Sequence, residues 1–251
     1  MLISPMMLAA ALTTGALADD SQSLRYILTL DGKEIGEREL TLRYLTTELG
    51  SEVRILESWT ALEVPLPAGG AYRYQQRLTG QGNTGGFSAR ISDGGLVREV
   101  QAAPTPSGWV VTVAEGEEAL VYQHAASEFQ LTSLGLMDPS APQRLAGASS
   151  LSVLTSEIGV IVSGPLEDRG EVLVPLGEGS VKAHEYLWAL PEGKVRLAYD
   201  AQGVLVRYTM RVAGRSVTAT LDAPPAGRSW GSAMEAPVIH LGGGGVEETE
   251  L

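Results

Sequence analysis

Residues 80–85 read Gly-Gln-Gly-Asn-Thr-Gly and match the glycine-rich loop of dinucleotide-binding folds letter for letter. That loop works because its glycines let the backbone approach a pyrophosphate at the start of a helix that follows a parallel strand. Here residues 87–91 alternate between apolar and polar side chains, which is typical of a strand. Since the pattern lacks the required helix, the sequence favours a hairpin loop at 80–85, and no cofactor is predicted.

Residues 227–231 read Gly-Arg-Ser-Trp-Gly and match the nucleophile elbow of hydrolases. An elbow requires a strand before the serine, a helix after it, and an acid and a histidine further along the chain. Pro224 and Pro225 come shortly before the motif, and the one histidine that follows it, His240, lies in a glycine-rich stretch. The sequence therefore favours a non-enzymatic protein, and no catalytic residue is predicted.

The histidines give no metal-binding pattern. His124, His184 and His240 lie far apart and the chain has no cysteine, whereas zinc sites depend on clustered His, Cys and carboxylate side chains. Glu185 follows His184 and could exchange a proton with it, but neighbouring residues of a strand point to opposite faces of a sheet. We therefore expect His184 to be a polar residue on the solvated face of a strand, and we predict no metal site.

Aromatic residues are the side chains with the clearest potential for binding. Several fall in runs that alternate like strands, namely Trp59, Tyr72, Tyr74, Trp109, Tyr186 and Trp188. Two interpretations stay open. The rings fill the core on the concave side of a curved sheet, or some of them line a groove there, because Tyr and Trp carry a polar tip that a pure core does not need. The groove interpretation assigns ligand binding to Trp59, Tyr74, Tyr186 and Trp188.

The elements that would position these rings are strands. Residues 181–222 contain four short alternating runs separated by glycine-containing turns, which predicts an antiparallel meander. Its alternation predicts a core-facing set that comprises Val204, Val206, Tyr208, Met210 and Val212. Residues 25–45 read as a hairpin, and Gly36 within it marks a bulge or a close approach of two backbones.

Further runs extend the same pattern along the chain. Strands are predicted near residues 53–64, 71–78, 87–91, 96–100, 109–113, 120–122, 151–154, 160–162 and 171–176. Residues 127–135 carry Phe129, Leu131 and Leu134 at roughly helical spacing, with Ser127 as a cap, and predict one short helix. The predicted fold class is mainly β: a single curved antiparallel sheet, an open half-barrel or β-clam, with at most one or two short helices.

Composition limits the class of partner. The net charge of −12 disfavours nucleic acid and anionic membrane surfaces, because both require clustered Lys and Arg. A hydrophobic content of 44% excludes disorder of the chain as a whole, and 30 glycines with 13 prolines fit a fold with many turns. No apolar run approaches the ~20 residues that cross a bilayer, so no membrane span is predicted.

The chain is predicted to have three parts. Residues 1–18 are typical of a signal peptide, with an apolar stretch and an Ala-Leu-Ala cleavage pattern at its end, although no Lys or Arg precedes that stretch. Cleavage there would leave a soluble periplasmic or secreted protein that, lacking cysteine, needs no disulfides. A β domain is expected over residues 19–222 and a flexible Gly/Glu-rich C-terminal tail over residues 223–251.

Residues 24–222 resemble a family of exported bacterial β-rich proteins known mainly as a domain of unknown function. The matching segments are Tyr26, then residues 31–36, 72–74, 181–186 and 197–200. The resemblance implies one strongly curved antiparallel sheet, similar to the half-barrel carriers of lipoproteins and to periplasmic envelope-integrity proteins. It brings no set of catalytic residues. Unlike the carriers, this sequence has no clear long helix to plug the barrel.

Two hypotheses of function follow. The first is a non-enzymatic periplasmic binding or envelope-maintenance protein that holds an apolar ligand, such as a lipid, or a segment of an envelope protein on its concave sheet. The second is a structural or interaction protein that works through an exposed strand edge or through its C-terminal tail.

Overall fold

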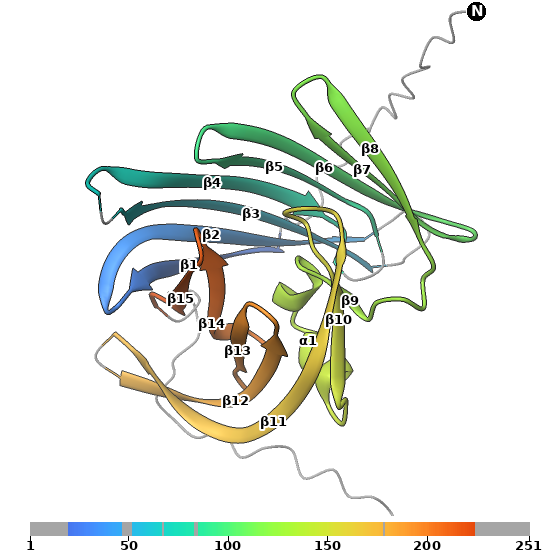
Figure 1. Cartoon of the computed structure of the whole chain (residues 1–251). Helices are drawn as coiled ribbons and strands as arrows, with labels where there is room; N and C mark the ends of the chain where they lie inside the picture. Colours follow the sequence, from blue (N-terminus) through green and yellow to red (C-terminus); the bar gives the residue numbers. More distant parts are fainter. Residues whose placement is uncertain (1–19, 47–51, 67, 83–84, 178, 224–251) are drawn as a thin grey trace, which may run out of the picture.

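The computed structural model describes residues 20–46, 52–66, 68–82, 85–177 and 179–223. In these residues fifteen strands form one sheet, in the order β8-β7-β6-β5-β4-β3-β2-β1-β15-β14-β13-β12-β11-β10-β9. Figure 1 shows that the sheet curves round on itself without closing. The predicted fold class is therefore confirmed. The predicted signal peptide and nearly all of the predicted tail lie outside the described residues.

The strands follow one another along the chain with two short helical segments between β9 and β10. Their bounds are β1 Asp20–Leu30, β2 Lys33–Thr46, β3 Glu52–Pro65, β4 Ala71–Gly80, β5 Phe87–Asp93, β6 Leu96–Thr105, β7 Gly108–Glu115, β8 Glu118–His124, β9 Leu131–Thr132, β10 Ser150–Leu154, β11 Ile161–Leu176, β12 Gly179–Leu190, β13 Gly193–Tyr199, β14 Leu205–Val212 and β15 Arg215–Leu221. The helical segments are a 3₁₀ turn, η1 (Gly135–Met137), and α1 (Ala141–Leu145).

Two meanders build the sheet. Strands β1 to β8 pair in chain order, and so do β10 to β15, each with an antiparallel neighbour. The two meanders join where β15 pairs with β1, with Tyr26 opposite Leu221 and Leu28 opposite Ala219. The parallel pair of β9 with β10 ends the sheet on the other side. Residues almost 200 positions apart in sequence thus share one core.

The predicted hairpin is confirmed as β1 and β2. Its register shifts between Leu28, which pairs with Gly36, and Thr29, which pairs with Glu34, so that Ile35 is the extra residue of a bulge. A Cβ atom on Gly36 would collide with the backbone carbonyl oxygen of Ala61 on β3. Gly36 therefore marks both a bulge and a close approach of backbones.

The predicted helix over residues 127–135 is wrong. The backbone N–H groups of Gln130 and Ser133 donate instead to the carbonyl oxygens of Ser152 and Leu154 on β10, which places β9 in the sheet. Leu131 and Leu134 are buried, as the apolar spacing indicated. Tertiary pairing with β10 has overridden a short local pattern that is marginal as a helix by itself.

Residues 160–162 and 171–176 were expected to form two separate strands, but β11 is continuous from Ile161 to Leu176. Its first five residues pair with β10 and the remainder pairs with β12. A bulge between Asp168 and Gly170 absorbs the irregular sequence between the two predicted runs. The break in alternation between the two predicted runs thus corresponds to a bulge within one continuous strand.

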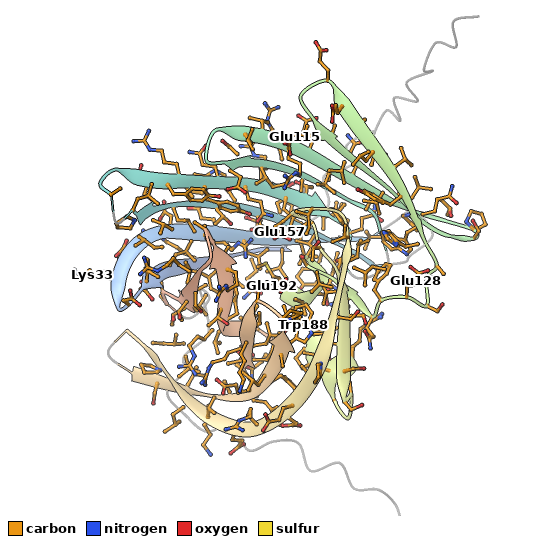
Figure 2. All side chains as sticks on the ribbon, viewed as in Figure 1. Lys33, Glu115, Glu128, Glu157, Trp188 and Glu192 are labelled. Carbon is orange, nitrogen blue, oxygen red and sulfur yellow. The ribbon has the colours of Figure 1, made fainter. Side chains whose placement is uncertain are left out.

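Alternating side chains from both meanders meet on the concave side of the sheet and form the core. Fully buried members include Tyr26, Leu40, Leu56, Ile91 and Tyr199. Figure 2 shows Glu157, Glu192 and Trp188 inside the curve of the sheet, whereas Lys33, Glu115 and Glu128 lie at its periphery. Among the described residues, no helix is long and apolar enough to cross a membrane.

Candidate functional site

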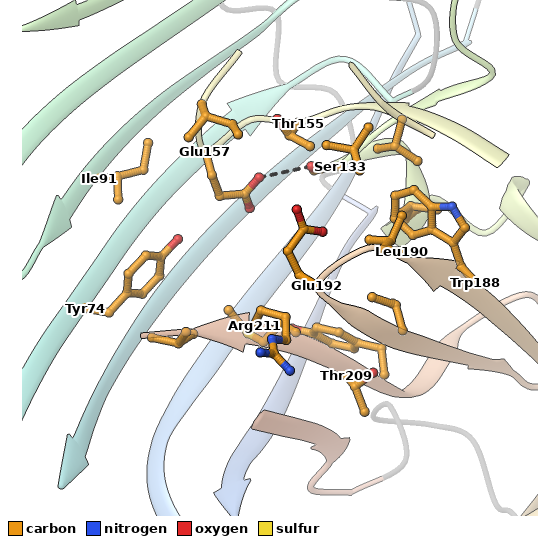
Figure 3. A pocket seen from close by; sticks show the side chains of 18 of the residues that line it. Tyr74, Ile91, Ser133, Thr155, Glu157, Trp188, Leu190, Glu192, Thr209 and Arg211 are labelled. Carbon is orange, nitrogen blue, oxygen red and sulfur yellow. Dashed lines mark hydrogen bonds between the residues drawn. The ribbon is translucent and has the colours of Figure 1, made fainter. Parts of the chain in front are cut away.

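The concave side of the sheet holds a cavity of about 460 Å³. This volume lies within the range of roughly 300–1,000 Å³ that is typical of small-molecule sites. Strands of both meanders and the loop of residues 155–160 line it (Figure 3). Apolar side chains form much of its wall, among them Leu136, Met137, Leu190, Leu197, Leu205, Met210 and Val212.

Two of the predicted groove residues line this cavity. Trp188 on β12 is buried, and its indole Nε1–H donates to the backbone oxygen of Leu151 at 3.1 Å. That bond satisfies the polar tip of the ring and fixes its orientation. Tyr74 on β4 is 6% exposed and faces the cavity from the other meander. Figure 3 shows the two rings on opposite sides of the space, with the Tyr74 hydroxyl directed into it.

The other two predicted groove residues lie elsewhere. Trp59 is 37% exposed and does not line the cavity, because its neighbours Ser58 and Thr60 on β3 are buried and the side chains of a strand alternate. The prediction that Trp59 lines the groove is therefore wrong, because the residue lies on the convex face of the sheet. Tyr186 is buried in the core, where its ring lies 6.4 Å from that of Tyr199 in an edge-to-face contact.

A buried arginine that the sequence analysis missed stands on the cavity wall. Arg38 on β2 is 4% exposed. Its Nε donates to the Thr60 hydroxyl at 2.7 Å, its Nη2 to the side-chain oxygen of Gln76 at 2.8 Å, and its Nη1 to the Tyr208 hydroxyl. The guanidinium carbon also lies 5.6 Å from the centre of the Tyr208 ring. All three hydrogen-bond partners are uncharged. Thr60 and Gln76 have no ionisable group, and burial raises the pKa of the Tyr208 hydroxyl so that it keeps its proton.

A signal for Arg38 was present in the sequence. Leu40 and Leu42 define the apolar face of β2, and Arg38 precedes Leu40 by two residues, so period-two alternation places it on the same buried face. A charged residue in the buried phase of a strand needs partners, and Gln76 occupies the equivalent phase of β4 between Tyr74 and Leu78. The two positions read together would have predicted a polar cluster within the core.

The loop of residues 155–160 brings a carboxylate to this cluster. Glu157 accepts hydrogen bonds from the side-chain amide of Gln76 at 3.2 Å and from the Ser133 hydroxyl at 3.2 Å. Its backbone oxygen accepts from Arg98 at 3.3 Å. Gln76 therefore connects Arg38 to Glu157 without direct contact between the two charges, which polarises the hydrogen-bonded chain.

Two polar atoms on the cavity wall are buried without a hydrogen-bond partner among the described residues. They are the hydroxyl of Tyr74 and Oδ1 of Asp93, which sits opposite Tyr74 on the neighbouring strand β5. Burial raises the pKa of the Tyr74 hydroxyl well above its usual value, so this group is neutral and keeps its proton to donate. Buried polar atoms without partners are costly, and on a cavity wall they are candidates for ligand contacts.

The histidines and the sequence motifs lie away from the cavity. His184 Nε2 lies 2.6 Å from Oδ1 of Asp168, and His124 Nδ1 lies 3.2 Å from a carboxylate oxygen of Glu128. Both are the His–carboxylate contacts that proton transfer would need, but neither histidine lines the cavity. At the glycine motif, Gly80 ends β4 and pairs with Phe87, the first residue of β5, as the expected hairpin requires.

His184 and Glu185 point to opposite faces, as predicted. Glu185 is buried and accepts hydrogen bonds from Arg196 at 3.2 Å and from Arg207 at 3.1 Å, on the side of the sheet away from Asp168. In the described part of the chain, no group of three or more His, Asp or Glu side chains is arranged to hold a metal ion. The serine motif at 227–231 lies outside the described residues.

Comparisons with known proteins give a structural likeness but no match in sequence. No family model matches the sequence, and no curated protein matches it. Among solved structures, the chain is similar to a β-barrel-like protein of the domain of unknown function DUF1849 from Brucella abortus, at 14% identity and a TM-score of 0.55, over 80% of this chain and 95% of that one. A DUF1329 family protein from Desulfovibrio piger aligns at 12% identity over 84% of this chain and 87% of that one, with a TM-score of only 0.21. The likeness to the Brucella abortus protein supports a β-barrel-like fold for this chain.

Proposed function

We propose that this chain is a non-enzymatic binding protein that holds an apolar or amphiphilic ligand in its concave cavity. The observation that carries the proposal is the cavity of about 460 Å³ between the two meanders, with a largely apolar wall that includes Trp188. An apolar ligand that enters such a space removes its own surface and that of the wall from water, at about 25 cal/mol per Å² of apolar area. A lipid chain, or an apolar segment of an envelope protein, has the required chemistry.

The proposed setting is the periplasm, in maintenance of the cell envelope. The apolar run and the Ala-Leu-Ala pattern within residues 1–18 support export, and the resemblance to envelope-integrity proteins and lipoprotein carriers supports the process. Fusion of residues 1–18 to a reporter that is active only after export provides the test. A fusion that stays in the cytoplasm contradicts this localisation.

Quenching of tryptophan fluorescence tests the binding function. A long-chain alcohol and the corresponding acid, each with two bromine atoms on the chain, should quench Trp188, because bromine quenches an indole on contact. We expect Trp188→Phe to remove the quenching, and Trp59→Phe to preserve it because Trp59 lies on the convex face. The proposal fails if neither compound quenches the wild-type protein, or if the quenching persists in Trp188→Phe.

A second candidate function is interaction through the edge of the sheet at β8. This strand pairs on one side with β7 and ends the sheet on the other. Leu120 and Val121 are 57% and 63% exposed, and they lie on opposite faces of the strand. Natural sheets usually protect such an edge with Lys, Pro or a bulge. Within β8 the sequence Glu-Ala-Leu-Val-Tyr-Gln-His has no Lys or Pro.

A second copy of the chain is the partner that fits this edge. In an antiparallel pair of two β8 strands, the register that uses all seven residues places Val121 opposite its own copy. Leu120 then faces Tyr122, so that apolar residues meet apolar residues, and Glu118 faces His124. The pair has the twofold symmetry of an isologous dimer.

Analytical ultracentrifugation over a range of protein concentrations tests the edge. The wild-type chain should pass from monomer to dimer, and Val121→Pro should remain monomeric because proline lacks the N–H that the new ladder requires. Val97→Pro is unsuitable as a control, because Val97 lies inside a paired strand. The control is instead Leu173→Lys, since Leu173 is exposed and lies far from β8. A chain that ends at Asp222 separates this edge from the C-terminal tail. A wild-type protein that remains monomeric at every concentration contradicts the proposal.

A further inference from the structure

The charge of Arg38 has no carboxylate in direct contact. Its three hydrogen bonds go to Thr60, Gln76 and Tyr208, and the nearest acid of the cluster, Glu157, is reached through Gln76. A guanidinium group has five N–H donors, so two of those on Arg38 have no partner among the described residues. A buried charge with neutral partners destabilises a fold unless something further compensates it. This residue stands on the wall of a cavity, where a ligand can supply that compensation.

The hydroxyl of Tyr74 adds a second unused donor to the same wall. It is buried, it has no hydrogen-bond partner among the described residues, and Figure 3 shows it directed into the cavity. The positions of Arg38 and Tyr74 are linked through the sheet. Thr60, which bonds to Arg38, pairs with Gln76 on β4, two residues from Tyr74. The guanidinium and the hydroxyl thus face the cavity from β2 and β4, the two strands that flank β3.

Most of the other charges on the wall are already bound or lie nearer to water than Arg38 does. Glu157 accepts from Gln76 and Ser133, and Arg98 is paired with Glu115 at 2.7 Å. Arg211 donates to the backbone oxygen of Gly214. Glu192 is exposed, in the turn between β12 and β13. Asp93 is half-buried as a residue, although its Oδ1 is buried and has no hydrogen-bond partner among the described residues. Water screens exposed charges more than buried ones, so the fully buried Arg38 has the strongest effect on a group placed beside it.

We infer that Arg38 and Tyr74 form a subsite for the anionic head group of an amphiphile, whose apolar chain lies along Trp188, Leu197 and Met210. The head group is a carboxylate or a phosphate, because both accept several hydrogen bonds from a guanidinium fork and a hydroxyl. This inference rests on the proposed binding function and names its class of ligand. It also accounts for the unpaired donors on this part of the wall, which are the Tyr74 hydroxyl and two N–H groups of Arg38.

Isothermal titration calorimetry with dodecanoate, dodecyl phosphate, dodecanol and dodecylamine tests the charge of the head group on the full chain. We expect dodecanoate or dodecyl phosphate to bind at least roughly tenfold more tightly than dodecanol, because a hydrogen bond to a charged group is worth more than one between neutral groups. Dodecylamine should bind most weakly, since its cation would sit beside Arg38. The comparison of dodecanoate with dodecyl phosphate distinguishes the two anionic classes.

Three variants locate the effect. Arg38→Met should abolish the preference for the anion over dodecanol. Tyr74→Phe should weaken binding of the anion several-fold, because the variant loses the one hydrogen bond that the hydroxyl donates to the head group. Tyr26→Phe is the matched control: its hydroxyl is also buried without a partner among the described residues, but Tyr26 does not line the cavity. It should leave the affinity unchanged. Should Arg38→Met fail to fold by circular dichroism, Tyr74→Phe, which removes a single oxygen, decides.

The outcomes separate this inference from the proposed function. If dodecanol binds as tightly as the anions, or if Tyr74→Phe leaves their affinity unchanged, the head-group subsite is overturned and the apolar cavity stands. Tighter binding of dodecylamine also overturns it and assigns the cavity to cations. If none of the four compounds binds, the proposed binding function itself fails.

Discussion

At the scale of single residues, the polar groups inside the sheet form two different arrangements. Glu185, with two arginines, is satisfied on both of its oxygens and belongs to the structure. The Tyr74 hydroxyl and two N–H groups of Arg38 have no partners among the described residues. Buried polar groups without partners lower the stability of a fold. Their presence here is therefore a candidate case in which binding is gained at the expense of stability.

The hydroxyl of Tyr74 makes that conflict measurable. We expect Tyr74→Phe to raise the free energy of unfolding of the ligand-free protein by about 1 kcal/mol, because it removes a buried polar atom that has no partner. Tyr26→Phe should stabilise the fold to a similar extent without an effect on binding. Urea denaturation at neutral pH measures both. A loss of stability in Tyr74→Phe would show that its hydroxyl has a partner, and would remove one donor from the subsite.

At the scale of elements, the loop of residues 155–160 and the bulge of β11 set the local geometry. The loop packs on the inner face of β6 and β7 through Gly159, whose φ is +70°. A Cβ atom there would lie 2.5 Å from Cγ2 of Val113 and 2.9 Å from Cγ1 of Val111. This close approach holds Glu157 over Gln76 and so completes the polar cluster.

A pair of glycine variants tests the packing of this loop. Gly159→Ala should destabilise the protein by about 3 kcal/mol, from the strain of a positive φ together with overpacking against the two valines. Gly147→Ala has a similar φ of +73° but no atom within 4 Å of the new methyl group, so it should cost only about 1 kcal/mol. Chemical denaturation compares the two. Equal losses would mean that the loop does not depend on the contact with β7.

The bulge of β11 gives a prediction about pH. The pKa of the exposed Asp168 is lowered mainly because the backbone N–H of Gly170 donates to its carboxylate at 2.9 Å; a small loss of hydration opposes this, and His184 adds a further hydrogen bond. A folded-state pKa below the unfolded value of about 3.9 means that the contribution to stability is complete above that pH and is lost as the pH falls through the lower, folded value.

Asp168→Asn should therefore reduce the acid sensitivity of the fold. The difference in free energy of unfolding between wild type and variant should be largest near neutral pH and should shrink as the pH falls below about 4. Urea denaturation measured across this pH range provides the comparison. A difference that stays constant down to the lowest pH would contradict a role for the ionised carboxylate at the bulge.

At the scale of the whole molecule, two meanders share one core. The pairing of β15 with β1 makes the sheet continuous, and the cavity takes its wall from both halves, with Tyr74 on β4 and Trp188 on β12. The likeness to the DUF1849 structure covers 95% of that chain and supports the fold alone. Neither meander by itself would bury the apolar face that it presents to the other.

Unfolding should accordingly be a single cooperative transition. Far-UV circular dichroism reports the strands of both meanders, and the fluorescence of Trp188 reports the cavity between them, so both signals should give the same midpoint in urea. A background in which Trp59, Trp109 and Trp230 are all replaced by Phe leaves Trp188 as the one source of tryptophan fluorescence. Two separate midpoints would mean that the meanders fold as independent units, against the single β domain predicted over residues 19–222.

Alternation and turn composition in the sequence determined the hairpin, the meander of residues 181–222 and the class of curved antiparallel sheet, because a strand with one buried face must alternate. The same local rule could not identify which face is inward in β3, where apolar residues occupy both phases, and so Trp59 was placed in the groove. It could not anticipate that β9 pairs with β10 instead of forming a helix, or that a bulge opposite Tyr199 interrupts the alternation of β14.

The cavity and its polar cluster were decided by the tertiary structure alone. Arg38, Gln76, Glu157 and Tyr208 come from β2, β4, a loop and β14, and no spacing in sequence brings them together. These residues meet because β15 pairs with β1 and so joins the two meanders. The curvature of the sheet then turns the inner faces of both meanders toward one space. Local pattern fixes which way a side chain points from its strand, whereas the partner it meets depends on long-range pairing.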